Sequence, residues 1–60
     1  MRFNELVRKL EGAGWVLERT GKSSLRIFTR NGERLVVHYH GSAEVPKGTA
    51  EAILKKAGLK

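Results

Sequence analysis

KSSLRIFTRNGERLVVHYH, at residues 22–40, is the stretch that decides the fold of this chain. Two short runs of strand-forming side chains lie on either side of Asn31-Gly32. An Asn-Gly pair between such runs is the strongest short-range signal for a β-hairpin, because a two-residue type I′ turn needs positive φ at both central positions. We therefore predict an antiparallel hairpin in which Arg30 lies opposite Glu33.

The turn also sets the register of the hairpin. Leu25 is then expected opposite His38. Side chains alternate between the two faces of a strand, so one face carries Leu25, Ile27, Thr29, Arg34, Val36 and His38. The other face carries Arg26, Phe28, Arg30, Glu33, Leu35 and Val37. We predict that helices cover this second face, because Phe28 is the only aromatic side chain in the paired runs.

Apolar residues at helical spacing occur near both ends of the chain. The first stripe comprises Phe3, Leu6, Val7, Leu10 and Ala13, and the second comprises Ala50, Ile53, Leu54 and Ala57. Such stripes are typical of amphipathic helices. Each stripe is followed by a glycine, Gly14 or Gly58, which suits the position just after a helix end. We predict two helices, with Thr49 as the N-cap of the second.

The order of the elements predicts the fold class. Residues 15–20, WVLERT, have the composition of a strand, so the order is helix, three strands, helix. A chain of 60 residues can bury its apolar side chains by placing two helices on one face of a three-stranded antiparallel sheet. We predict a single α+β domain over residues 1–60. Its α-β-β-β-α order resembles a double-stranded RNA-binding domain.

Charge and composition limit the functions that are compatible with the chain. Twelve Lys and Arg against six Asp and Glu give a formal charge of +6, which favours polyanionic partners. Neither predicted helix combines a basic face with bulky aromatic anchors, so a membrane partner is not expected. The chain has no cysteine and no apolar run near the ~20 residues that cross a bilayer. No signal-peptide pattern is seen at the N-terminus. We expect a soluble cytoplasmic protein.

Several motifs together resemble the HicA family of mRNA interferase toxins. They are GAGWVLERTGK at residues 12–22 and LVVHYHGSAEVPKGTAEAILKKAGL at residues 35–59, of which PKGT at residues 46–49 opens the most specific part. The resemblance covers nearly the whole chain. It implies a small basic ribonuclease that cleaves mRNA without a metal ion or other cofactor. It also implies silencing by a co-encoded HicB antitoxin, with a higher-order toxin–antitoxin complex as a further expectation.

The chain departs from the family pattern at the catalytic position. The family typically reads Gly-Ser-His at the start of the second strand, and that His is the catalytic residue. The matching positions here are Ser23, Ser24 and Leu25. Leu25 can neither accept nor donate a proton, so the general acid or base of the family is absent from its usual place. The resemblance therefore supports the fold and RNA affinity better than catalysis. Natural degeneration, engineered inactivation and compensation elsewhere all remain open.

Two histidines lie near this position. His38 occupies a site where family members commonly carry Pro, and the predicted pairing puts its Cβ about 5 Å from that of Leu25. Either the catalytic His has moved from position 25 to position 38, or His38 is an ordinary cross-strand neighbour. His40 matches a His that is common in the family before the loop, which implies a fold or RNA-contact role. Two imidazoles alone supply too few ligands for a metal site, and none is expected.

Three cations are candidates for contacts with RNA phosphates. Lys22 lies beside the loop between the first two strands, Arg26 lies near the start of the second strand, and Lys47 precedes the second helix, whose N-terminal N–H groups favour anions. Lys22 and Lys47 are equally compatible with solvated loop charges. Hydroxyl groups that can also bind phosphate belong to Ser23, Ser24 and Thr49.

Three functions are compatible with this sequence. The first is a HicA-like toxin, an mRNA-directed endoribonuclease by resemblance, with mRNA and a HicB-like antitoxin as its partners. Its cleavage is expected to be absent or altered because of Leu25. The second is a non-catalytic RNA-binding module, which Leu25 favours. The third is an interaction protein whose basic surface binds only an acidic antitoxin.

Overall fold

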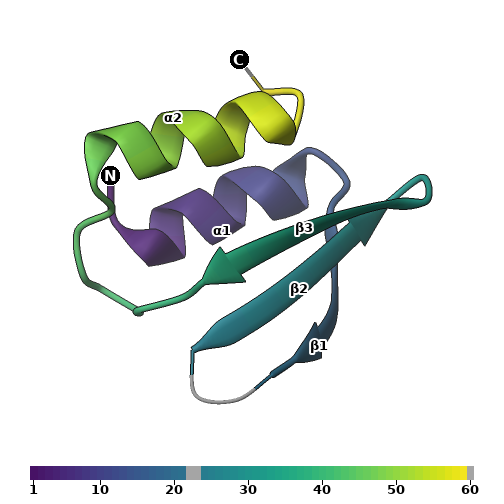
Figure 1. Ribbon diagram of the computed structural model, residues 1–60, viewed down its shortest axis with the longest axis horizontal. Coiled ribbons are helices and arrows are strands. Elements are labelled where there is room, and N and C mark those ends of the chain that lie inside the picture. The colour runs from purple at the N-terminus through teal and green to yellow at the C-terminus, as the bar shows by residue number, and fades with distance from the viewer. Residues whose placement is uncertain (22–23, 60) are drawn as a thin grey trace.

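The computed structural model of the chain describes residues 1–21 and 24–59. Its elements are α1 (Phe3–Gly12), β1 (Val16–Thr20), β2 (Leu25–Arg30), β3 (Glu33–His38) and α2 (Lys47–Lys56). The strands form one antiparallel sheet in the order β1-β2-β3, and both helices lie on the same side of it (Figure 1). The predicted α+β class and α-β-β-β-α order are confirmed. Neither helix in the described chain has the length and apolar character that a bilayer crossing requires.

The hairpin of β2 and β3 has the predicted turn and register. Asn31 has φ of 50° and Gly32 has φ of 83°, so both central residues have the positive φ of a type I′ turn. Arg30 pairs with Glu33 at the turn, and the same register pairs Leu25 with His38 at the far end. The chemistry of the turn therefore determines which residues lie opposite each other at the start of β2.

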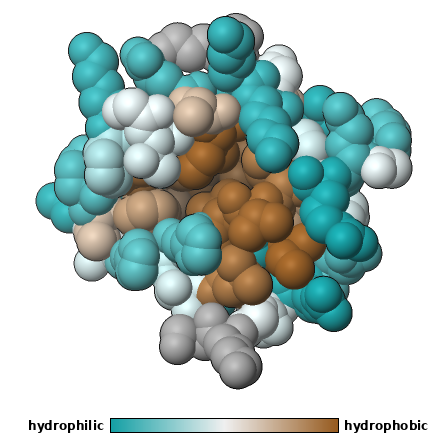
Figure 2. Space-filling model, viewed as in Figure 1, coloured by the Kyte–Doolittle hydropathy of each residue, from teal (hydrophilic) through white to brown (hydrophobic). Residues whose placement is uncertain are grey.

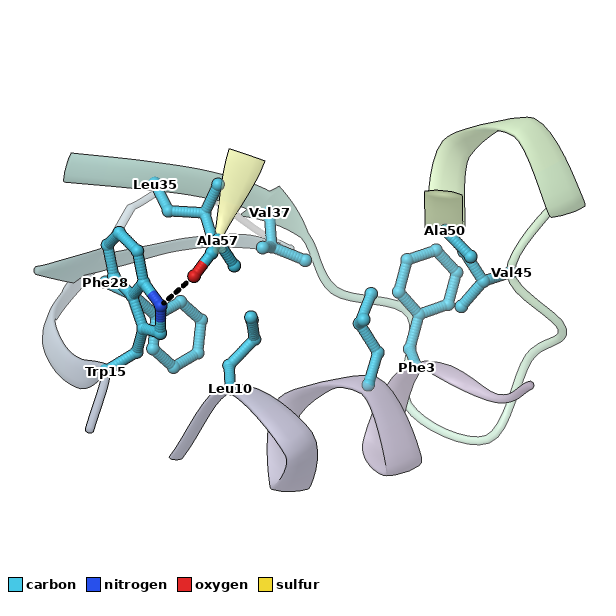
Figure 3. Close-up of a cluster of buried hydrophobic side chains, with 10 residues drawn as sticks. Phe3, Leu10, Trp15, Phe28, Leu35, Val37, Val45, Ala50 and Ala57 are labelled. Atoms are coloured by element: carbon cyan, nitrogen blue, oxygen red, sulfur yellow. Dashed lines mark hydrogen bonds between the residues drawn. The ribbon is translucent and has the colours of Figure 1, made fainter. Parts of the chain in front are cut away.

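The face of the hairpin that carries Phe28 is the buried one, as predicted. Phe28, Leu35 and Val37 are each at most 2% exposed. They join a core to which α1 contributes Phe3, Leu6 and Leu10, and α2 with its C-cap contributes Ala50 and Ala57 (Figure 3). On the opposite, uncovered face of the sheet, Ile27 is also buried, because it lies in the central strand between cross-strand neighbours.

Both helices end as the glycines predict. Gly14 has φ of 95°, and the N–H of Trp15 beyond it donates to the carbonyl of Leu10 at 3.0 Å. Gly58 has φ of 80°, and the N–H of Leu59 donates to the carbonyl of Leu54 at 2.9 Å. These are Schellman motifs, which satisfy carbonyl groups that a helix end otherwise leaves unpaired.

The start of α2 differs from the expected one. Thr49 was expected to be the N-cap, but the helix begins at Lys47 and the N-cap is Pro46. The N–H of Ala50 donates to the carbonyl of Pro46 at 2.9 Å, which adds a helical bond before the expected start. Pro46 has φ of −55°, a value that its ring imposes and that suits the entry to a helix. Thr49 therefore lies within the first turn.

β1 is an exposed edge strand with an irregular register. All five of its side chains are exposed. The register shifts between Leu17 and Arg19, so Glu18 is the extra residue of a β-bulge. Trp15 was expected to begin this strand, but it lies just before β1 and is 2% exposed. The end of α1 determines its position, because its N–H belongs to the Schellman motif.

Arg30 and Trp15 connect the hairpin to the C-terminal ends of both helices. Nη1 of Arg30 donates to the carbonyl of Ala13 at 3.2 Å, and its guanidinium lies 4.7 Å from the centre of the Trp15 ring. Nε1 of Trp15 donates to the carbonyl of Ala57 at 3.2 Å (Figure 3). A cation is favourable at a helix C-terminus because the carbonyl groups there carry partial negative charge. One end of the hairpin thus holds both helix ends.

The N-terminus holds the loop between β3 and α2 in place. Arg2 and Glu44 form an isolated antiparallel bridge, and the N–H of Val45 donates to the carbonyl of Met1 at 2.8 Å. The amino group of Met1 also pairs with the Glu44 carboxylate at 2.5 Å. This hydrogen bond and the positive charge hold the pKa of Glu44 below its usual value. The loop at residues 39–46 is thereby fixed against the start of α1.

Candidate functional site

Position 25 lies at the surface, on the uncovered face of the sheet. Leu25 is the first residue of β2, is half-buried and pairs directly with His38. Its side chain packs against Gly21, where a Cβ atom would lie 2.6 Å from Cδ2 of Leu25. The N–H of Gly21 donates to the carbonyl of Leu25 at 2.9 Å. A side chain at position 25 is therefore held between Gly21 and the strand that carries His38.

Gly21→Ala is expected to displace the Leu25 side chain and to lower the free energy of unfolding by about 1 kcal/mol, because the new methyl group overlaps Leu25. Urea unfolding measures the change. Leu25→Ala in the same chain should remove most of the penalty, because it removes the atoms that collide. A double-mutant cycle in which the two effects simply add would show that the two residues do not contact each other.

His38 and His40 line the same groove beside α2. The groove has a volume of about 520 Å³ and lies between β3, the loop at residues 39–46 and α2. Thr49 contributes to the α2 side of the groove. The ring of His40 meets the ring of Phe3 edge-on, with centroids 5.2 Å apart. The structure thus brings three predicted site residues into one groove, which we call the histidine groove, and His38 connects it to Leu25.

The predicted cations do not all lie near Leu25. Arg26 is on the helix-covered face of the sheet, because consecutive residues of a strand point in opposite directions. Its guanidinium lies 4.9 Å from the centre of the Tyr39 ring. Lys47 is exposed at the first position of α2 and is not among the residues that line the histidine groove. Neither of these two cations therefore lines the histidine groove.

The other predicted residues lie at the connection before β2. Ser24 is half-buried, and its carbonyl accepts a hydrogen bond from the N–H of Tyr39 at 2.6 Å. This bond ties the start of β2 to the chain that follows β3. The predicted RNA contacts at Lys22 and Ser23 lie outside the described residues.

The structure also shows a site that sequence reasoning missed. A second cleft, of about 320 Å³, is lined by Val7, Arg8, Glu11, Leu17, Arg26 and Tyr39, among others. We call it the helix-side cleft. The alternation of side chains along β3 places residue 39 on the same face as Arg26, which is a signal that could have found this pair. Within residues 1–21 and 24–59, no three His, Asp or Glu side chains are grouped to hold a metal ion.

Fold and site define a class of small, strongly basic α-β-β-β-α domains in which the start of β2 lies beside a surface groove. The family described as "HicA toxin of bacterial toxin-antitoxin" matches residues 3–59. The chain therefore belongs to the HicA toxin family, which confirms the resemblance seen in its sequence motifs. Toxins of this family pair with antitoxins in bacterial toxin–antitoxin systems. No curated protein matches the chain at a significant level.

Proposed function

We propose that this chain is a HicA-family toxin that binds mRNA and has lost most of the endoribonuclease activity implied by the family resemblance. Leu25 is the observation that carries the proposal. It occupies the position of the family's catalytic His, at the surface and directly opposite His38. A hydrocarbon side chain there provides no group for proton transfer. The formal charge of +6 supports binding to a polyanion such as RNA.

Metal-independent cleavage of RNA requires two proton transfers. A base takes the proton of the 2′-hydroxyl group, an acid protonates the leaving oxygen, and nearby cations stabilise the charge on the phosphorus centre. His38 is the imidazole that lies across the strand pair from position 25, and its side chain is exposed. Any cleavage that remains is therefore expected to depend on His38.

The test combines RNA binding with cleavage. The purified protein is expected to bind labelled mRNA with an affinity that falls as salt rises, and to cleave it slowly. His38→Ala should lower that slow cleavage by about 10²-fold, while binding changes by less than about twofold. His40→Ala is the matched control, because this exposed imidazole lines the same groove; its expected fold or RNA-contact role affects binding, so the cleavage rate at saturating RNA should stay unchanged.

Each result separates the possible functions. Slow cleavage that survives His38→Ala would show that the catalytic group has not moved to position 38. Binding without any cleavage would identify a non-catalytic RNA-binding module. Absence of RNA binding even at low salt would reject an RNA-directed function and would leave an antitoxin as the only partner.

We further propose a HicB-like antitoxin as the protein partner, in the cytoplasm and within a higher-order complex. Family membership supports such a partner, and the positive charge of the chain favours an acidic binding surface on it. A HicB-like reading frame beside the coding sequence, and co-purification of its product with this chain, would test the pairing.

A further inference from the structure

The helix-side cleft is separate from the proposed cleavage site, because it lies on the other face of the sheet. It opens between α1, β1 and β2. Figure 2 has the same orientation as Figure 1 and shows hydrophobic side chains exposed in the middle of the side of the molecule that faces the viewer. The cleft has a volume of about 320 Å³, at the lower end of the range of roughly 300–1,000 Å³ found for ligand pockets. It therefore has room for one small chemical unit.

Apolar side chains and cations both line the cleft, and we call the apolar part its floor. Val7, Leu17 and Phe28 supply the apolar side chains, and Leu17 is 41% exposed although it pairs with Phe28 on the helix side. Arg8 and Arg26 supply the cations. An apolar floor with cations beside it suits a ligand that combines a flat ring with a negative charge.

Arg26 is held in a conformation that suits such a ligand. Its guanidinium lies 4.9 Å from the centre of the Tyr39 ring, and its hydrogen bond to the carbonyl of Leu25 is long, at 3.4 Å. Neither Arg26 nor Arg8 has a carboxylate within ion-pair distance in the described part of the chain. Guanidinium groups stack on nucleobases and bind phosphate oxygens through several donors. Apart from the Nη1 group of Arg26 that donates to Leu25, the donors of the two arginines face no carboxylate within ion-pair distance that would compete with a phosphate in the described part of the chain.

Two further residues favour a nucleotide over an acidic peptide. Glu11 lines the cleft and can accept a hydrogen bond from the exocyclic amino group of a base, a donor that acidic side chains lack. Asn4, which also lines the cleft, offers both a donor and an acceptor for a base edge. The side chains of an acidic peptide carry only acceptors at neutral pH, so they cannot donate to Glu11.

We propose that the helix-side cleft binds one unpaired nucleotide of single-stranded RNA. The base lies on the apolar floor and the phosphate lies beside Arg8 and Arg26. The proposal rests on the proposed function, in that RNA is the polymer that supplies the nucleotide. Because Leu25 and Arg26 are consecutive residues on opposite faces of β2, an RNA strand that occupies both sites has to cross from one face of the sheet to the other.

A titration with a mononucleotide, followed by NMR, tests directly whether the cleft binds it. Cytidine monophosphate is expected to shift the NMR signals of the Val7 and Leu17 methyl groups, and inorganic phosphate or a pentaglutamate peptide should shift them much less. Equal shifts with inorganic phosphate would reduce the cleft to an anion site and overturn the proposal. Larger shifts with the peptide would identify an acidic protein segment as the ligand and would also overturn the proposal. The absence of any shift with cytidine monophosphate would overturn it as well.

A pair of variants tests the same site with RNA. Arg26→Gln should weaken binding to a single-stranded oligoribonucleotide about tenfold and lower the slope of its salt dependence by about 0.7. Lys55→Gln, an exposed cation in the last turn of α2, makes the same change in charge and should cost less than about twofold. Equal losses would show a general charge effect and overturn the proposal. If the proposed function is wrong but the cleft does bind a nucleotide, the mononucleotide will shift the methyl signals although the protein has no affinity for mRNA.

Discussion

Leu25→His is expected to raise the rate of mRNA cleavage by about 10²–10⁴-fold. The change places an imidazole at the position that the family resemblance proposes for the catalytic His, a half-buried surface position opposite His38. In the present chain the Leu25 side chain fills the space beside Gly21. Because Gly21 has no side chain, the new ring in the variant Leu25→His can occupy the same space. Initial rates on labelled mRNA measure the gain. The rate should also depend on pH near the usual imidazole pKa of about 6.5.

Two control variants distinguish a restored site from a general effect of an added histidine. Leu25→Gln has a similar size but cannot transfer protons at neutral pH, so it should leave cleavage unchanged. Val16→His adds the same imidazole to an exposed position of β1 that pairs with Thr29 and lines neither the histidine groove nor the helix-side cleft, and it should have no effect on cleavage. If folded Leu25→His binds RNA and still does not cleave it, position 25 is not part of a cleavage site in this chain.

Trp15→Ala is expected to lower the free energy of unfolding by about 3–5 kcal/mol. Trp15 is 2% exposed, donates a hydrogen bond to the carbonyl of Ala57 and lies under the guanidinium of Arg30. Its removal leaves a cavity between the hairpin and both helix ends. At about 0.05–0.15 kcal/mol per residue, a 60-residue domain has a stability of only about 3–9 kcal/mol. Much of the Trp15→Ala protein should therefore be unfolded.

Urea unfolding followed by far-ultraviolet circular dichroism measures this loss, because the variant no longer has tryptophan fluorescence. Trp15→Phe keeps most of the apolar contact and loses the hydrogen bond, so it should cost about 1–2 kcal/mol. Leu17→Ala, at an exposed position, should cost less than either. A loss below about 1 kcal/mol for Trp15→Ala would show that the two helix ends do not depend on this side chain.

Local chemistry determines the parts of the fold that the sequence predicts. Asn31-Gly32 determines the turn, and the turn determines that Leu25 lies opposite His38. Gly14 and Gly58 mark the helix ends, because both adopt a positive φ. The buried face follows from Phe28. Each of these features depends on residues that are close in sequence, or on the two-residue period of a strand.

The features that the sequence did not predict depend on contacts between distant segments. The bulge at Glu18 has no local signal in WVLERT. Trp15 is not part of β1, because its N–H donates a hydrogen bond to the carbonyl of Leu10 at the end of α1. His38, His40 and Thr49 share a groove because the Arg2–Glu44 bridge fixes the loop after β3. Arg26 was expected near phosphate, and strand alternation places Tyr39 on its face, but the cleft itself also needs α1 and β1, which are distant in sequence from Tyr39.

The junction of Arg30 and Trp15 has a consequence for how the molecule opens. Through these two side chains the carbonyl of Ala13 and the carbonyl of Ala57 are both bound to one end of the hairpin. If either helix frays from its C-terminus, the indole of Trp15 becomes exposed, and the other helix end also loses its contact with that side chain. Partial opening at this end therefore exposes apolar surface shared by three elements, and the small toxin loses its structure as one cooperative unit rather than helix by helix.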